Sequence, residues 1–218
     1  MLSITEENYL KALLHISEDG SKQQEAGTNQ IAAQLNVRPA TATDMLKKLK
    51  DKGLVDYQKY GKVSLTEIGR THAINVVRKH RLWETFLYDK LEFSWDEVHE
   101  VAEQLEHIKS EKLIERLDKY LGHPQFDPHG DIIPSAKGEL ITEHRKTLAE
   151  ATLSARKKVY AVKDNSPAFL QYVSQLGIAI GNYITIKNRF DFDGSMDIEI
   201  NGKQATISQK VAENIFIK

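Results

Sequence analysis

Histidine and glutamate side chains gather on two neighbouring segments of this 218-residue chain. His80 and Glu84 are four residues apart in a stretch with helical periodicity, so they share one face of a helix. The following segment carries a second set, at offsets of four, seven and eight residues: His99, Glu103, Glu106 and His107. Any one of these residues alone would favour a solvated polar face. Two adjacent clusters of imidazole and carboxylate instead indicate binding of a first-row divalent metal ion.

The absence of cysteine narrows the choice of metal. No thiolate ligand is available and disulfides are excluded. The remaining nitrogen and oxygen donors favour Mn²⁺ or Fe²⁺ over a structural Zn²⁺.

The signatures of a metalloenzyme are missing. His99-Glu100-Val101-Ala102-Glu103 has only the first half of the HExxH motif, and no histidine has a glutamate three residues before it. A glycine-rich phosphate loop and a G-x-S-x-G elbow are also absent. We therefore predict no enzymatic activity and no small organic substrate, and a metalloenzyme is the weaker alternative.

The first 65 residues have the pattern helix, helix, turn, helix and hairpin. Apolar residues recur at helical spacing after Thr5 and after Thr28, and a third helix is predicted over residues 41–52. Two short β-rich runs then meet at Tyr60-Gly61-Lys62. This order is typical of a winged helix-turn-helix, whose third helix enters the major groove of DNA.

Basic residues are concentrated in the same part of the chain. Residues 38–62 hold seven Lys and Arg against three Asp, a net charge of +4, whereas the whole chain carries −1. A basic stripe suits DNA phosphates, and small residues at the start of a helix can approach base edges. The alternatives are a solvated helix face and tight packing. The predicted DNA contacts are Arg38, Pro39, Ala40, Thr41, Thr43, Lys47, Lys48, Tyr60 and Lys62.

The central part of the chain is predicted to be helical. A long helix is capped by Thr66 and reaches about Leu91, and the next is capped by Ser94 or a neighbour. An amphipathic helix covers residues 110–121. Residues 122–138 are rich in proline and glycine and are predicted to be loop, and residues 142–160 are polar and predicted to be a helical linker.

The last part changes to β periodicity. From Gly181 onwards apolar residues alternate with polar ones, and Asn201-Gly202 between two such runs indicates a type I′ hairpin. A small β-barrel is therefore predicted, and the fold class is mostly α with a small β domain. No stretch approaches the roughly 20 apolar residues of a membrane helix. With no secretory signal at the N-terminus, we expect a cytoplasmic protein without a membrane partner.

Three motifs resemble the diphtheria-toxin-repressor family of metal-dependent regulators, including its manganese-sensing branch. They are Leu65-Thr66 with Gly69-Arg70, the run Lys79-His80-Arg81-Leu82-Trp83-Glu84, and the block from Val98-His99 to Glu106-His107. The resemblance implies a repressor of metal-uptake genes that binds palindromic double-stranded operator DNA as a homodimer when loaded with Mn²⁺ or Fe²⁺. The alternative is a winged-helix transcription factor that needs no metal.

The domain organisation of longer family members carries over to nearly the whole chain. It implies a winged helix-turn-helix DNA-binding domain at 1–65 and a helical metal-binding and dimerisation domain at 66–138. A helical linker at 139–160 and an SH3-like (FeoA-type) β-barrel at 161–218 complete it.

The ligands of the family also match positions in this sequence. The resemblance assigns an ancillary metal site to His80, Glu84 and His99. It assigns the regulatory metal site to Asn8, Glu103, Glu106 and His107. Further candidates for the ancillary site are Asp127 and His129, in a loop that is alternatively a plain turn, and Asp164.

Three positions depart from the family pattern. The iron-sensing branch has cysteine at the position of Glu103 and methionine at that of Asn8. The manganese-sensing branch has glutamate at the first position but aspartate at the second, and another glutamate where Lys11 stands. The resemblance therefore leaves both Mn²⁺ and Fe²⁺ open, and Lys11 argues against the two-metal site of the short manganese sensors.

The basic stripe generates a prediction for Lys47→Ala. Loss of one phosphate contact is expected to weaken binding to specific and unrelated DNA alike, and to lower the slope of log K against log salt by about one. Fluorescence-anisotropy titrations over a range of salt concentrations measure both quantities. An unchanged slope would argue against a phosphate contact by Lys47.

Overall fold

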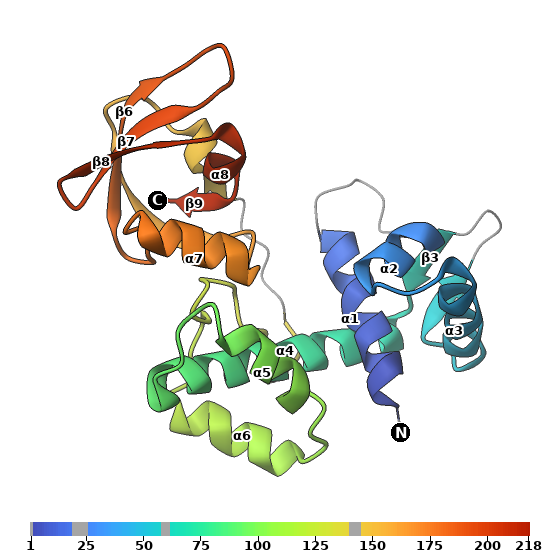
Figure 1. Ribbon diagram of the computed structural model, residues 1–218. Coiled ribbons are helices and arrows are strands. Elements are labelled where there is room, and N and C mark those ends of the chain that lie inside the picture. The colour runs from blue at the N-terminus through green and yellow to red at the C-terminus, as the bar shows by residue number, and fades with distance from the viewer. Residues whose placement is uncertain (1, 19–25, 58–61, 140–144) are drawn as a thin grey trace. The chain divides into compact units, whose positions relative to one another are not determined.

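A computed structural model describes residues 2–18, 26–57, 62–139 and 145–218 of the chain. These residues form two compact units, and Figure 1 labels most of their helices and several of their strands. The first unit is drawn from residues 1–80, 105–110 and 134–140, and the second from 81–104, 111–133 and 141–218. Helix α4 (Glu67–Leu91) contributes to both units, because the division falls between His80 and Arg81. Among the described residues, no helix is both long enough and apolar enough to cross a membrane.

The first unit contains the predicted winged helix-turn-helix. Its elements are α1 (Ile4–Glu18), β1 (Ala26–Gly27), α2 (Thr28–Gln34), α3 (Pro39–Asp51), β2 (Val55–Tyr57) and β3 (Lys62–Leu65). The strands form an antiparallel sheet in the order β1-β3-β2, with Val55 opposite Leu65. The element order confirms the prediction. Tyr60 and Gly61, at the tip of the predicted hairpin, lie outside the described residues.

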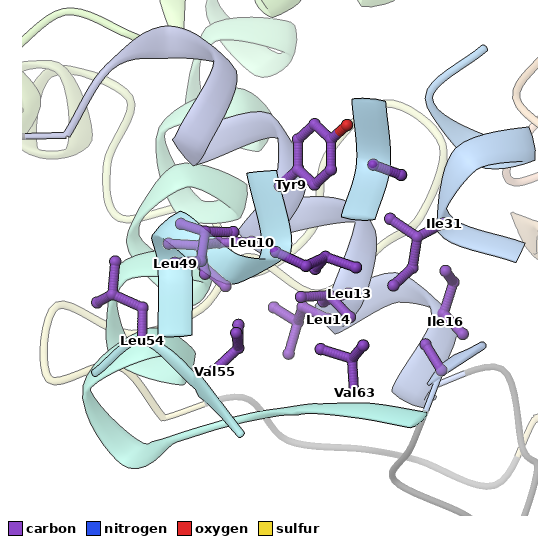
Figure 2. Packing of buried hydrophobic residues seen from close by; sticks show 14 of the residues in the cluster. Tyr9, Leu10, Leu13, Leu14, Ile16, Ile31, Leu49, Leu54, Val55 and Val63 are labelled. Carbon is purple, nitrogen blue, oxygen red and sulfur yellow. The ribbon is translucent and has the colours of Figure 1, made fainter. Parts of the chain in front are cut away.

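A single apolar cluster holds these short elements together. Figure 2 shows Leu10 and Leu14 of α1 pointing toward Ile31 of α2, Leu49 of α3 and Val63 of β3, and all five side chains are almost fully buried. Leu10 and Leu14 are four residues apart, so they lie one turn apart on the same helix face. Full burial of such a side chain contributes about 2 kcal/mol relative to exposure. The cluster therefore fixes α3 against α1.

Helix starts differ from the predicted ones by a few residues. Ser3, and not Thr5, caps α1, because the Ser3 and Glu6 side chains each accept a hydrogen bond from the other residue's backbone N–H. Helix α3 begins at Pro39, two residues before the predicted Thr41, since proline suits the first helical position. Ser94 hydrogen-bonds Glu97 in a turn, and α5 begins only at Val98. Thr66 caps α4 as predicted, accepting from the Gly69 N–H.

The second unit combines helices with a C-terminal sheet. The helices are the later part of α4, α5 (Val98–Leu105) and α6 (Glu111–Tyr120). The strands are β4 (Lys146–Thr147), β5 (Arg156–Val162), β6 (Tyr183–Arg189), β7 (Met196–Ile200), β8 (Lys203–Ile207) and β9 (Ile215–Ile217). They are antiparallel in the order β4-β9-β5-β6-β7-β8. Three short helical segments, which the sequence patterns did not predict, are η1 (Leu148–Glu150), α7 (Pro167–Gln175) and α8 (Gln209–Glu213).

The alternating pattern of the C-terminal strands is confirmed by their burial. Ile184 and Ile186 of β6 and Ile198 of β7 are fully buried on one side of the sheet. The β7–β8 turn has positive φ at both Asn201 and Gly202, as a type I′ hairpin requires. The predicted fold class, mostly α with a small β domain, agrees with the structure.

The predicted helical linker at 139–160 is wrong over its described part. Residues 146–147 and 156–162 are strands of the C-terminal sheet, and 148–150 form a 3₁₀ turn. The basic residues at the start of β5, of which Arg156 and Lys158 are exposed, gave the segment its polar character. Its buried positions, Val159 and Ala161, alternate with period two and are residues of the sheet core. The C-terminal domain therefore begins near residue 146 instead of 161.

At Gly130 the loop after α6 passes very close to strand β5 of the C-terminal sheet. It has φ +83°, and a Cβ atom there would lie 2.1 Å from the carbonyl oxygen of Tyr160 in β5. Gly130→Ala is expected to destabilise the chain by roughly 2–4 kcal/mol, because it adds a backbone clash to an unfavourable φ. Chemical denaturation followed by circular dichroism measures the loss.

The matched control is Gly122→Ala in the same unit. Gly122 has a similar φ of +76°, but a Cβ atom there would meet no neighbouring atom within 4 Å. It should show the cost of the φ angle alone, about 1 kcal/mol. Equal losses in the two variants would contradict the proposed role of the close approach.

Candidate metal-binding sites

The second unit contains a fully buried group of three potential ligands. Glu84 of α4, with Asp127 and His129 of the turn after α6, each offer one donor atom, and these atoms lie within 4.8 Å of one another. The three side chains are at most 1% exposed. We call them the Glu84 group. Asp127 and His129 were predicted as ancillary candidates with a plain turn as the alternative, and the structure brings both to Glu84.

The turn that carries Asp127 and His129 is built by its own hydrogen bonds. One carboxylate oxygen of Asp127 accepts the backbone N–H groups of His129 at 2.8 Å and Asp131 at 2.9 Å. The Gly130 N–H donates to the Asp127 carbonyl. This Asx-type turn fixes the Asp127 side chain without any contribution from a metal.

The ring of His129 is oriented by Trp95. Its Nε2 lies 2.7 Å from the Trp95 carbonyl oxygen, which can only accept, so Nε2 carries the proton. The other nitrogen, Nδ1, lies 3.7 Å from a Glu84 carboxylate oxygen and 4.0 Å from one of Asp127. It is buried without a hydrogen-bond partner among the described residues. A histidine held by one ring nitrogen, with the other facing carboxylates, is the usual arrangement of a metal ligand.

Several ionisable side chains lie close together in the Glu84 group, and they shift one another's pKa values. Burial, with the nearby carboxylates of Asp131 and Glu84, raises the pKa of Asp127 to about 7. Burial lowers the pKa of His129, but the interaction with Glu84 and the charge of Asp127 outweigh it and raise the pKa to about 9. The group therefore favours bound positive charge, which a divalent cation supplies more completely than a proton.

Two further side chains, His99 and Arg81, lie beside the Glu84 group. His99 Nδ1 lies 3.3 Å from Glu84 and His99 Nε2 lies 3.6 Å from Glu103, with the histidine side chain 40% exposed. On the other side, Arg81 Nε lies 3.7 Å from Asp127 and Arg81 donates to the Ile132 carbonyl. Asp164 is not part of the group. Its carboxylate accepts the Ser166 N–H just before α7, and its proposed role as a ligand stays a prediction.

A second group lies in the first unit. It brings together residues from α1, α4 and the segment after α5: Lys11, His80, Glu106 and His107, which we call the Glu106 group. Glu106 is fully buried, and its Oε2 lies 2.6 Å from His80 Nδ1 and 2.7 Å from the Lys11 ammonium. The resemblance assigned His80 to the ancillary site, and that assignment stays a prediction; within the first unit its Nδ1 also lies beside Glu106.

His107 is oriented by a residue that the sequence analysis did not single out. Its Nδ1 donates to Glu7 at 2.7 Å, and its Nε2 then faces Glu106 Oε1 at 3.7 Å. Burial alone would raise the pKa of Glu7, but hydrogen bonds from Lys109 and His107 hold it below its usual value. Glu7 precedes the predicted Asn8 on α1, and it had no sequence signal because its partners are about 100 residues away.

Two of the buried oxygens without partners in the first unit belong to candidate ligands. Glu106 Oε1 and Asn8 Oδ1 have no hydrogen-bond partner among the described residues. Asn8 is three residues before Lys11, so both lie on the same face of α1. Carboxylate and amide oxygens together with imidazole nitrogen form a donor set that Mn²⁺ and Fe²⁺ accept. The residues present therefore fit a divalent ion.

The predicted DNA contacts lie mostly on the outer face of α3. The exposed residues among them are Arg38, Pro39, Ala40, Thr41, Lys47, Lys48 and Lys62. Thr43 is half-buried and its hydroxyl donates to the Pro39 carbonyl, while Ala42 and Leu46 on the opposite face are buried. Tyr60 lies outside the described residues. Helix α3 therefore presents small and basic side chains while its apolar face holds it to the core.

Three family models match successive parts of the chain. Residues 1–63 match the iron dependent repressor, N-terminal DNA binding domain, and residues 66–135 match the iron dependent repressor, metal binding and dimerisation domain. Residues 146–218 match the FeoA domain. The boundaries of this last match agree with the strands at 146–162.

Individual relatives support the same assignment. The iron-dependent repressor IdeR of Mycobacterium tuberculosis is 36% identical over 130 residues, which are 60% of this chain and 55% of the relative, so the match spans little more than half of that protein. The diphtheria toxin repressor of Corynebacterium diphtheriae is 27% identical over 98% of this chain and 96% of its own.

Solved structures extend the similarity over the full length. A manganese-dependent transcriptional repressor in complex with manganese superimposes with a TM-score of 0.86 at 35% identity, covering 97% of this chain and 98% of that one. The manganese regulator SloR superimposes with a TM-score of 0.79 at 34% identity, covering 98% of this chain and 97% of its own.

The proposed metal site at the Glu84 group can be tested by measuring how many metal ions each variant binds per chain. After equilibrium dialysis against Mn²⁺, His129→Ala and the isosteric Glu84→Gln are each expected to hold one ion fewer per chain than the unsubstituted protein, because each removes a buried donor. Elemental analysis by mass spectrometry measures the content. His123→Ala is the matched control, since His123 is 70% exposed and pairs with Asp118 outside the group. Unchanged metal content in both His129→Ala and Glu84→Gln would rule out this site.

Proposed function

The chain belongs to the iron-dependent repressor family, of the diphtheria-toxin-repressor type, and from this premise we propose that it is a metal-dependent transcriptional repressor. It binds palindromic operator DNA as a homodimer when loaded with Mn²⁺ or Fe²⁺. Its targets are metal-uptake genes, and it acts in the cytoplasm, where that DNA is. No residue has a catalytic role.

The observation that carries the proposal is the position of Glu106. Its buried carboxylate has one oxygen without a partner and one in contact with Lys11 of α1, the first helix of the winged helix-turn-helix. An atom of a proposed ligand is thus packed directly against α1 within one compact unit. Binding of an ion at this point acts on the element that positions α3.

The residues proposed to hold the ions form two sets. Asn8, Glu106 and His107, with His80, supply the regulatory site, and Glu103 remains a candidate from the sequence. Glu84, Asp127 and His129, with His99, supply the ancillary site. The metal, when bound, supplies a double positive charge that neutralises buried carboxylates and links segments distant in sequence.

The packing of α1 against α3 connects metal binding to the affinity for DNA. Asn8 and Lys11 lie on α1, whose Leu10 and Leu14 pack in the same cluster as Leu49 of α3. Holding Asn8 to Glu106 and His107 therefore restricts where α3 can lie. In a dimer, the two recognition helices must be about 34 Å apart, one turn of DNA, or a multiple of it. Apparent affinity falls by the fraction of molecules that do not meet this spacing.

The proposal is tested by DNA binding with and without metal. Promoter DNA from the genes flanking its own gene is titrated by fluorescence anisotropy in chelator, Mn²⁺, Fe²⁺ or Zn²⁺. Affinity is expected to rise at least about tenfold with Mn²⁺ or Fe²⁺, a typical coupling between two sites. Tight binding that is equal in chelator would instead identify a winged-helix factor that needs no metal.

Substitution of the proposed ligands makes the test specific. Glu106→Ala and His107→Ala are each expected to abolish the metal-dependent gain in DNA affinity and to leave the dimer intact in analytical ultracentrifugation. His72→Ala, at an exposed position of α4, is the matched control and should retain the full gain. Undiminished metal activation in both ligand variants would remove these residues from the regulatory site.

A further inference from the structure

Lys11 occupies an unusual position for a lysine. It is only 8% exposed, and its ammonium lies 2.7 Å from Glu106 Oε2 and 3.2 Å from His80 Nδ1. Three segments distant in sequence meet at this nitrogen: α1, α4 and the residues after α5. Lysine is rarely buried to this extent unless it is paired.

The atoms around the ammonium are metal-ligand atoms. An ammonium group only donates hydrogen bonds, so the Glu106 oxygen accepts from Lys11. His80 Nδ1 lies 2.6 Å from the same oxygen and 3.2 Å from Nζ, so the three atoms form one close cluster. Carboxylate oxygen and deprotonated imidazole nitrogen are donors that a divalent ion uses. In the structure the ammonium of Lys11 occupies the position beside both.

The rest of the Glu106 group does not face Lys11 in the same way. Glu106 Oε1 is directed toward His107 Nε2 at 3.7 Å and has no hydrogen-bond partner among the described residues. One carboxylate thus has a cation at one oxygen and an unsatisfied atom at the other. The ammonium balances the charge of the buried carboxylate but leaves Oε1 without a hydrogen bond.

We propose that Lys11 is a resident cation of the regulatory site, which holds the place of the divalent ion in the metal-free protein and must withdraw when the ion binds. The inference rests on the proposed function, because it takes Glu106 and His80 to be ligands of the ion. Lysine suits the role, since its charge is a compact point at the end of a flexible four-carbon stem. Lys11 thereby sets the metal concentration at which the protein responds.

A purely structural role for Lys11 makes a different prediction. If the ammonium only neutralises Glu106, its removal destabilises the protein and leaves metal affinity unchanged or lower. If the ammonium competes with the ion, its removal destabilises the metal-free protein and raises metal affinity. Stability and affinity therefore move in opposite directions only under competition.

The experiment uses Lys11→Met, which removes the charge and keeps most of the stem. Mn²⁺ affinity is measured by competition with a fluorescent chelator, in the Glu84→Gln background so that the ancillary site does not contribute. We expect affinity to rise on the order of 10- to 100-fold, as expected when a like charge at contact distance is removed. The melting temperature in chelator should fall, and added Mn²⁺ should raise it more than in the unsubstituted chain.

Two further variants separate charge from packing. Lys52→Met is the matched control, since Lys52 pairs with Glu6 at 2.6 Å in the same unit and neither residue is a proposed ligand. It should leave Mn²⁺ affinity unchanged. Lys11→Arg keeps the charge and should gain no affinity. If Lys11→Met does not fold in chelator, Lys11→Gln provides the same comparison.

The outcomes distinguish this inference from the proposed function. Unchanged or weaker Mn²⁺ binding in Lys11→Met, with normal binding in the unsubstituted chain, would overturn the role of Lys11 alone. A gain in Lys11→Arg equal to that in Lys11→Met would overturn it as well, because charge would not be the cause. Absence of Mn²⁺ binding at Glu106 in every variant would overturn the regulatory site itself.

Discussion

An ionised carboxylate that is withdrawn from water must have positive charge beside it, because its desolvation costs several kcal/mol that packing alone does not return. Glu84, Asp127 and Glu106 are all buried carboxyl groups, so this cost applies to each of them when it ionises. Each lies beside basic side chains: Glu84 beside His99 and His129, Asp127 beside Arg81, and Glu106 beside Lys11 and His80. Glu106 Oε1 and His129 Nδ1 nevertheless have no hydrogen-bond partner among the described residues. Buried carboxylates beside such open donor atoms give each unit a group suited to a divalent ion.

The elements around these carboxylates serve chiefly to keep them buried and aligned. Helix α4 carries ligand candidates of both groups one turn apart, His80 and Glu84, on the two sides of the division between the units. The segment after α5 brings Glu106 and His107 to α1, and the Asx-type turn brings Asp127 and His129 to α4. Helix α1 in turn packs against helix α3 in the apolar cluster of Figure 2.

Local patterns in the sequence were informative where the interaction is also local. Helical spacing of His80 with Glu84 and of His99 with Glu103, the cap at Thr66 and the Asn201-Gly202 hairpin all depend on residues within a few positions, and the structure contains each of them. The contacts of Lys11 with Glu106 and of Glu7 with His107 join residues about 100 positions apart, so no periodicity could indicate them. The prediction for strand β5 was wrong because the run Arg156-Lys157-Lys158 at its start hid the alternation of Val159 and Ala161. The assignment of ligands came from family resemblance, and geometry has added Glu7 and Trp95 as the residues that orient them.

His129 is held at both ends: its ring donates to the Trp95 carbonyl, and its own backbone carbonyl accepts the Val162 N–H of β5. A candidate ligand whose ring is held in this way fixes the geometry of its site. Ca²⁺ takes six to eight oxygen donors at about 2.3–2.6 Å in adaptable loops, whereas smaller transition ions accept fewer donors and nitrogen among them. The C-terminal sheet, through its hydrogen bond to this loop, would thereby add the stiffness of a turn to the nitrogen donor of His129, and both favour a small transition ion over Ca²⁺.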